Sequence, residues 1–311
     1  MRKLKIGLAL GSGSSRGWSH IGVINALTEQ GIKPDIICGT SMGALVGASY
    51  VAGNLSKLEA WVSSLTKFET ARLFEINSAL NGFVNTQRLH HLLNELVTSN
   101  RSEIENLPKI YASVATDLET GREVWLTKGS VLEAVWSSIS LPGLFPAIRK
   151  NEKWLVDGGL VNPVPVSVCR AMGAEIVIAV NLNGDIIGRH FPKTVKVNKV
   201  KSKEVTEEIK DQGVMYKFTD MLEGYTASLF STKTDKEYSP SFFEAIASSV
   251  NITQDRITKS RMVGDPPEIL LSPKLSHIGL LELYRGKEAI IEGENSVKRM
   301  LPEIQRVLNT G

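Results

Sequence analysis

The chain has 311 residues and a mass of 34.0 kDa, about twice the commonest domain size, so one large domain or two small ones are expected. Hydrophobic residues make up 42% and charged residues 22%, which excludes a disordered, collagen-like or fibrous chain. The 36 basic and 33 acidic residues leave a net charge of only +3, too weak to indicate a nucleic-acid-binding protein.

No segment predicts export or membrane insertion. The apolar run near the start covers only Ile6 to Leu10, shorter than the core of a signal peptide, and no run reaches the roughly 20 apolar residues that cross a bilayer. Cys38 and Cys169 lie in apolar stretches without the spacing of a disulfide framework, which fits a reducing compartment. The sequence therefore predicts a soluble, cytoplasmic protein.

Short aliphatic or β-branched runs alternate with helical patterns along the chain. Strands are expected at residues 4–10, 35–38, 110–116, 123–126, 153–156, 175–182 and 268–271. Helices are expected at residues 16–30, 42–51, 131–138, 166–172, 242–261 and 286–308. This alternation predicts one α/β domain, residues 1–311, with a largely parallel sheet covered by helices on both faces. Its core is expected at about 4–182 and its C-terminal helices at about 240–311.

One segment, about residues 185–238, interrupts this alternation. Five lysines occur between residues 193 and 203, and apolar residues then recur at helical spacing between residues 214 and 229. The segment is either an insertion that packs on the domain with its lysines in solvent, or a basic amphipathic flap. Such a flap would cover an active site or contact an anionic lipid surface peripherally through about residues 193–231.

The strongest motif is G-x-S-x-G at residues 39–43, in which Gly39 and Gly43 flank Ser41. It follows an apolar strand and opens a helical pattern rich in small residues, and a sharp strand-to-helix turn projects such a serine hydroxyl. The N–H groups at the start of a helix favour an oxygen that gains negative charge, so the amide of Met42 is a natural oxyanion donor. The setting predicts Ser41 as a catalytic nucleophile, with a close-packed turn as the alternative.

A second glycine-rich turn, GSGSSRG at residues 11–17, follows the first expected strand. A dinucleotide-binding fingerprint fails because Arg16 occupies the sixth position, and a Walker phosphate loop fails because no G-K-[ST] is present. An oxyanion loop remains, in which backbone N–H groups point at the carbonyl oxygen of a bound ester. The candidate donors are Gly11, Ser12, Gly13, Ser14, Ser15 and Arg16. A tight turn without this role is the alternative.

A nucleophilic serine needs a general base, and two residues are candidates. His277 lies late in the chain, as the histidine of an α/β-hydrolase triad does, but the serine motif comes early for that fold. Asp157 is the better candidate because it follows an expected strand and precedes Gly158 and Gly159, so its carboxylate can lie against another strand's end. Histidines and cysteines lack metal-ligand spacing, so we expect neither a metal ion nor a cofactor.

Together these blocks resemble the patatin-like phospholipases, a family of lipid acyl hydrolases that use a Ser–Asp dyad. The resemblance covers about residues 4–182 and rests on the glycine-rich loop with HIGV after it, the serine motif, the Ser/Pro stretch at 138–146, and Asp-Gly-Gly at 157–159. With VGDPP at 263–267, the chain is most similar to the small bacterial patatin-like proteins of the RssA type. The resemblance implies a three-layer α/β/α fold with a central, mostly parallel sheet.

The resemblance also implies roles for individual residues. Ser41 would attack a lipid carboxyl ester and form an acyl-enzyme, with Asp157 as the base. Partial burial would raise the pKa of Asp157. Amides of Gly13 and Ser14, with their neighbours, would hold the oxyanion, and Arg16 would brace the loop.

The loop departs from the family pattern, because Ser12, Ser14 and Ser15 interrupt the usual run of glycines. A residue other than glycine resists positive φ, so we expect a less well aimed loop and low or restricted activity.

Three functions follow from these observations. The leading one is a cytoplasmic lipid acyl hydrolase of the phospholipase A, lysophospholipase or carboxylesterase type, at most peripheral at the inner membrane surface. The others are a Ser41–Asp157–His277 hydrolase of soluble esters or thioesters, and a catalytically weak lipid-binding regulatory protein. Nothing in the sequence indicates an oligomeric state.

Overall fold

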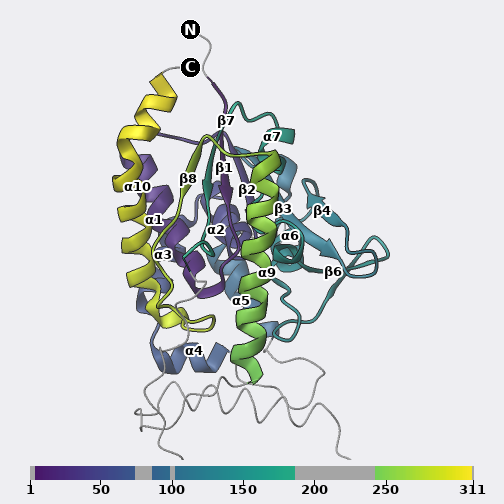
Figure 1. Cartoon of the computed structure of the whole chain (residues 1–311). Coiled ribbons are helices and arrows are strands. Elements are labelled where there is room, and N and C mark those ends of the chain that lie inside the picture. Colours follow the sequence, from purple (N-terminus) through teal and green to yellow (C-terminus); the bar gives the residue numbers. More distant parts are fainter. Residues whose placement is uncertain (1–3, 74–85, 99–101, 186–241, 310–311) are drawn as a thin grey trace, which may run out of the picture.

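The computed structural model describes residues 4–73, 86–98, 102–185 and 242–309 of the chain (Figure 1). The expected insertion at about 185–238 therefore lies almost wholly outside the described residues, as does the proposed lipid-contacting stretch at 193–231.

An eight-stranded sheet forms the centre of the described chain, in the order β5-β6-β3-β2-β1-β7-β8, with β4 also paired to β3. Strands β1, β2, β3, β7 and β8 run parallel, and β4, β5 and β6 are antiparallel to their neighbours. The strands are β1 (Ile6–Leu10), β2 (Ile36–Thr40), β3 (Ile110–Asp117), β4 (Glu123–Leu126), β5 (Ile148–Lys150), β6 (Lys153–Asp157), β7 (Ile176–Val180) and β8 (Ile269–Leu271).

Helices lie on both faces of this sheet (Figure 1). The α-helices are α1 (Ser19–Glu29), α2 (Met42–Val51), α3 (Leu55–Ser64), α4 (Lys67–Leu73), α5 (Thr86–Leu96), α6 (Val131–Ile139), α7 (Val166–Ala171), α9 (Phe242–Gly264) and α10 (Gly286–Asn309). Short 3-10 helices are η1 (Ser14–Trp18), η2 (Ile104–Asn106), η3 (Gly158–Leu160) and η4 (Leu283–Arg285).

Alternate residues of the buried strands supply two separate cores. Leu8 and Leu10 of β1 belong to a large apolar cluster with residues of α1, α2, α3, α5, α6 and α10. Ala9 faces the other way, into a smaller cluster with α7 and with Met262 of α9. Both faces of the central strands are thus buried, as expected for parallel strands in a layered α/β fold.

The structure confirms the α/β class and the mostly parallel sheet. The expected helix at 16–30 begins as the 3-10 helix η1, and helices α3, α4 and α5 and strand β5 are not among the expected elements. β5 and β6 form an antiparallel hairpin, so the strand alternation does not continue as parallel crossovers throughout. The single-domain assignment stays a prediction.

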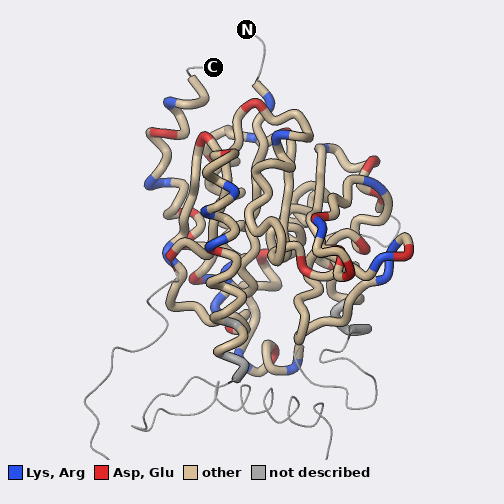
Figure 2. Tube along the Cα trace, turned by 45° about the vertical axis from the view of Figure 1, so that its right-hand side comes forward, with Lys and Arg blue, Asp and Glu red and all other residues tan. Residues whose placement is uncertain are grey.

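Three features of the described residues bear on the earlier expectations. Figure 2 shows basic and acidic residues interspersed along the described chain. Cys38 and Cys169 are buried and not joined by a disulfide. Among the described residues, no helix has the length and apolar character needed to cross a bilayer.

Candidate active site

Ser41 occupies the turn between β2 and α2, in a backbone conformation that serines rarely adopt, with φ 56° and ψ −124°. The turn is tight enough to require glycine on both sides. A Cβ on Gly39 would lie 2.4 Å from the carbonyl oxygen of Gly43, and a Cβ on Gly43 would lie 2.1 Å from that of Leu10. A strained φ/ψ held by close packing is typical of a functional position.

The sheet register brings Ser41 and Asp157 together. Thr40, the last residue of β2, pairs with Val114 of β3, and Asp157, the last residue of β6, pairs with the next residue, Ala115. The ends of β2 and β6 therefore meet at successive positions along β3. There the Ser41 hydroxyl donates a hydrogen bond of 2.6 Å to Asp157 Oδ2.

The Asp157 carboxylate is buried, with 2% of the residue exposed. Its second oxygen, Oδ1, accepts a 2.7 Å hydrogen bond from the N–H of Gly159 in the turn that follows. Burial raises the pKa of Asp157 to about 6, although the hydrogen bonds from Ser41 and Gly159 oppose that rise. Desolvation disfavours the charged form of the carboxyl group more than two hydrogen bonds favour it.

Ser138 supports the turn from the neighbouring helix α6, a role that the sequence did not reveal. The N–H of Ser41 donates to Ser138 Oγ at 2.8 Å, and the Ser138 hydroxyl donates to the carbonyl of Val114 at 2.6 Å. Ser138 opens the Ser/Pro stretch on which part of the family resemblance rests. The Ser/Pro stretch indicated that this segment belongs to the site, but its sequence did not show that Ser138 accepts a hydrogen bond from Ser41.

The glycine-rich loop leaves two of its amides free. Four of the six candidate donors bond within the protein: Gly11 to Val180, Ser12 to Pro163, Ser15 to Leu280 and Arg16 to Gly13. The N–H groups of Gly13 and Ser14 have no partner within the described part of the chain, and both residues line the same cavity as Ser41. Of the expected donors at 11–16, these two amides are the ones that remain available to a bound group.

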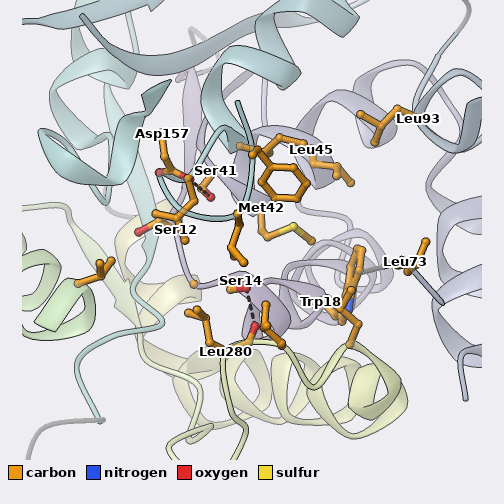
Figure 3. Close-up of a pocket in the computed structure, with 18 of the residues that line it drawn as sticks. Ser12, Ser14, Trp18, Ser41, Met42, Leu45, Leu73, Leu93, Asp157 and Leu280 are labelled. Carbon is orange, nitrogen blue, oxygen red and sulfur yellow. Dashed lines mark hydrogen bonds between the residues drawn. The ribbon is translucent and has the colours of Figure 1, made fainter. Parts of the chain in front are cut away.

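Ser14 shows how the loop accommodates a serine where the family usually has glycine. It adopts positive φ, 48°, and its hydroxyl donates a 2.5 Å hydrogen bond to the carbonyl of Leu280 (Figure 3). Ser15 Oγ donates to the same carbonyl at 2.8 Å. A hydrogen bond to a distant carbonyl thus offsets part of the cost of a non-glycine residue in this conformation. The expected low or restricted activity stays a prediction.

Two buried side chains, Arg16 and His20, contact backbone carbonyls of the loop. Arg16 is 1% exposed, and its Nε donates to the carbonyl of Gly13 at 3.2 Å, which agrees with a bracing role. Burial lowers the pKa of Arg16 to about 9. His20 Nε2 lies 2.7 Å from the carbonyl oxygen of Gly11, and burial lowers the pKa of His20 to about 4, so this imidazole is neutral near pH 7.

Ser41 and Asp157 line a cavity of about 110 Å³ whose remaining walls are mainly apolar. Figure 3 shows the two side chains pointing toward one another at one side, with Trp18, Leu73 and Leu93 at the opposite side. Other apolar walls come from Met42, Leu45, Leu58, Trp61, Leu144 and Phe145. Within the described residues, no lysine or arginine lines it. The cavity therefore fits an uncharged, apolar chain extending from a group held at Ser41.

His277, the candidate for a triad, does not line this cavity. Its Nε2 lies 2.5 Å from Glu288 Oε1 on α10, and about half of its side chain is exposed. The geometry joins Ser41 to Asp157 and leaves His277 in a surface contact with Glu288. Over the part of the chain that the structure describes, no three His, Cys, Asp or Glu side chains gather as a metal site.

Fold and site together define a layered α/β protein with a buried serine–aspartate pair, whose serine lies in the turn between strand β2 and helix α2. The model of the family described as patatin-like phospholipase matches residues 8–170, which is more than half of the chain. The chain belongs to the patatin-like phospholipase family.

Several curated relatives match more than half of the chain. An uncharacterised NTE family protein of Mycobacterium tuberculosis is 38% identical over 184 residues, 59% of this chain and 51% of the relative. Human patatin-like phospholipase domain-containing protein 6 is 33% identical over 187 residues, 57% of this chain and 13% of that protein. Lysophospholipase NTE1 of Saccharomyces cerevisiae is 33% identical over 187 residues, 57% of this chain and 11% of that protein. This chain thus spans about half or less of each relative.

Among solved structures, VipD from Legionella pneumophila aligns with 97% of this chain and 67% of its own, at 13% identity and a TM-score of 0.44.

Proposed function

We propose that the protein hydrolyses carboxyl esters of lipids through an acyl-enzyme on Ser41, with Asp157 as the general base. The observation that carries the proposal is the 2.6 Å hydrogen bond from the Ser41 hydroxyl to a buried carboxylate at the wall of an apolar cavity. Membership of a phospholipase family and similarity to a protein named lysophospholipase support it.

The first half of the reaction follows from this geometry. Ser41 Oγ attacks the ester carbonyl carbon while its proton passes to Asp157 Oδ2, which already accepts the hydrogen bond. The carbonyl oxygen becomes an oxyanion, which the unpartnered N–H groups of Gly13 and Ser14 and the amide of Met42 at the start of α2 stabilise. Asp157 then protonates the departing alcohol, and the acyl group stays on Ser41.

Deacylation reverses the roles. Asp157 takes a proton from a water molecule that attacks the acyl carbonyl, and the same amides stabilise the second oxyanion. The bond between the acyl carbon and Ser41 Oγ then breaks, Asp157 returns the proton to Ser41 Oγ, and the fatty acid leaves. A pKa of about 6 leaves most of the carboxylate ionised at neutral pH and makes it a stronger base than an aspartate in water. The acyl chain would occupy the apolar cavity throughout, which favours lipid esters over small soluble ones.

Covalent labelling with a fluorophosphonate probe tests the nucleophile directly. We expect the wild-type protein to be labelled at Ser41, as located by mass spectrometry, and the Ser41→Ala variant to remain unlabelled. The Asp157→Asn variant should be labelled far more slowly because no base accepts the serine proton. Ser137→Ala is the matched control, since Ser137 is a buried serine of α6 outside the cavity.

The same variants are then assayed with an acyl-ester series in buffer that contains a metal chelator. Hydrolysis lost in Ser41→Ala and Asp157→Asn but retained in Ser137→Ala and His277→Ala supports the dyad. A large loss in His277→Ala would instead support the triad. A well-folded wild-type protein that binds lipid but shows neither labelling nor turnover would contradict the proposal and favour a regulatory lipid-binding protein.

A further inference from the structure

Two amide side chains one turn apart on helix α9, Asn251 and Gln254, contact the oxyanion loop at both of its ends. We propose that these two residues are positioning residues, which hold the loop in the geometry that acyl transfer at Ser41 requires. The proposal rests on the function proposed above. Neither residue lies within residues 8–170, the part that the family model matches.

Gln254 ties the start of the loop to two other segments of the site. Its Oε1 accepts a 2.9 Å hydrogen bond from Ser12 Oγ and another of 2.9 Å from Asn183 Nδ2, just beyond β7. With Oε1 engaged in this way, Nε2 packs against the turn after Asp157, where a Cβ on Gly159 would lie only 2.3 Å from it. The side chain is 5% exposed, so one buried amide joins the loop, the end of β7 and the Asp-Gly-Gly turn.

Asn251 acts on the other end of the loop through Arg16. Its Oδ1 accepts a 2.8 Å hydrogen bond from Arg16 Nη2, and Arg16 Nε donates to the carbonyl of Gly13 at 3.2 Å. The peptide unit that joins Gly13 to Ser14 is planar and trans. Holding the Gly13 carbonyl on one side therefore fixes the direction of the Ser14 N–H on the other.

Arg16 depends on α9 because no described carboxylate pairs with it. It is 1% exposed, and its Nη1 has no hydrogen-bond partner within the described chain. A buried guanidinium with so few acceptors gains strongly from each one it keeps. Removing the Asn251 acceptor should therefore release Arg16 and, with it, the carbonyl of Gly13.

The loop needs such support because serines stand where glycines are usual. Ser14 adopts a positive φ of 48°, a conformation that persists only when surrounding structure holds it. The carbonyl of Leu280 holds Ser14 and Ser15, while α9 holds Ser12 and Arg16. The serine-containing loop is thus fixed by side chains and carbonyls from the last third of the chain.

Steady-state kinetics of Gln254→Met and Asn251→Leu test the proposal. Both changes preserve approximate side-chain size and remove the oxygen that accepts the hydrogen bond. We expect kcat to fall about 10–100-fold, since small displacements of catalytic groups cost up to about 100-fold, while KM stays within about twofold. Thr258→Val is the matched control, because Thr258 is a buried α9 residue whose hydroxyl has no hydrogen-bond partner among the described residues.

The conservative variant Asn251→Asp separates positioning from packing. An aspartate keeps an acceptor for Arg16, so kcat should stay within about threefold of the wild-type value by retention of that bond. Equal losses of kcat in Asn251→Asp and Asn251→Leu would overturn the proposal, as would wild-type kcat in both Gln254→Met and Asn251→Leu.

Hydrogen exchange distinguishes failure of this inference from failure of the proposed function. The amide of Arg16 donates to the carbonyl of Gly13 within the loop, and the amide of Ser15 donates to the carbonyl of Leu280. We expect both amides to exchange faster in Gln254→Met and Asn251→Leu than in Thr258→Val. If the wild-type protein hydrolyses no ester, the function fails, and faster exchange still supports the positioning role. Exchange unchanged from the control would overturn that role, with or without activity.

Discussion

Replacing Asp157 by asparagine should inactivate the protein and also make it more stable at neutral pH. Burial raises the pKa of Asp157 from an ordinary 3.8 to about 6, which means that the folded state binds the proton more tightly than the unfolded state does. The contribution of this group to the stability of the wild-type protein therefore decreases as pH rises from about 4 to about 6. An asparagine cannot ionise, so the variant escapes this decrease.

The size of the effect follows from the pKa difference. One pKa unit corresponds to about 1.4 kcal/mol, so ionising this buried carboxyl group costs the folded state about 3 kcal/mol. The stability of Asp157→Asn relative to the wild-type protein should therefore increase by up to about 3 kcal/mol between pH 4 and pH 7. The variant should also lose some stability at every pH, because the single side-chain oxygen of asparagine cannot accept hydrogen bonds from both Ser41 and Gly159.

Equilibrium urea unfolding of both proteins across this pH range measures the difference. Ser41→Ala is the matched control, since it removes the hydroxyl but keeps the buried carboxyl group. Relative to Asp157→Asn, its stability should fall between pH 4 and pH 7 at least as much as that of the wild-type protein does. Parallel profiles for Asp157→Asn and the wild-type protein would refute the reasoning, because they would mean that burial does not raise the pKa of Asp157.

Three further predictions concern catalysis and the loop. The acid limb of the kcat/KM profile should reflect a pKa of about 6, with activity falling about tenfold per pH unit well below it; a profile flat down to pH 4.5 would contradict Asp157 as the base. Thermal unfolding should show Ser14→Ala less stable than Ser14→Gly by about 1 kcal/mol, because only glycine tolerates positive φ freely, and equal melting temperatures would count against that strain. Leu45→Trp should fill part of the cavity and reduce kcat/KM for decanoyl esters about tenfold, while kcat/KM for acetyl esters changes little. An equal loss on both esters would show that the acyl chain of the substrate does not occupy this cavity.

Much of the site was predictable because its chemistry is encoded in local sequence. Gly39 and Gly43 are required by backbone contacts within one turn, so the motif itself indicates an exposed serine after a strand. The Asp-Gly-Gly turn likewise places Asp157 at the end of a strand. Family membership, suggested by four such ordered blocks, is confirmed by the family match over residues 8–170. The catalytic roles of Ser41 and Asp157 stay predictions until they are measured.

The elements that the sequence failed to predict show where local patterns lose information. α3 and α4 follow α2 closely, and β5 is a three-residue strand that exists through its pairing with β6. A strand so short has no periodicity of its own to detect. The antiparallel direction of β6, which brings Asp157 to the end of β2, is likewise a property of strand pairing.

The sequence by itself determined the fold class, the strained serine turn and the candidate base, because each depends on residues close together in the chain. Only the tertiary structure showed that, within the described residues, the amides of Gly13 and Ser14 have no partner, and that Ser138, Asn251 and Gln254 form hydrogen bonds with the serine turn and the glycine-rich loop. The physical reason is distance along the chain: Ser12 and its acceptor Gln254 are 242 residues apart. Hydrogen-bond partners so far apart leave no periodic pattern, and they meet only when the sheet and its covering helices have assembled.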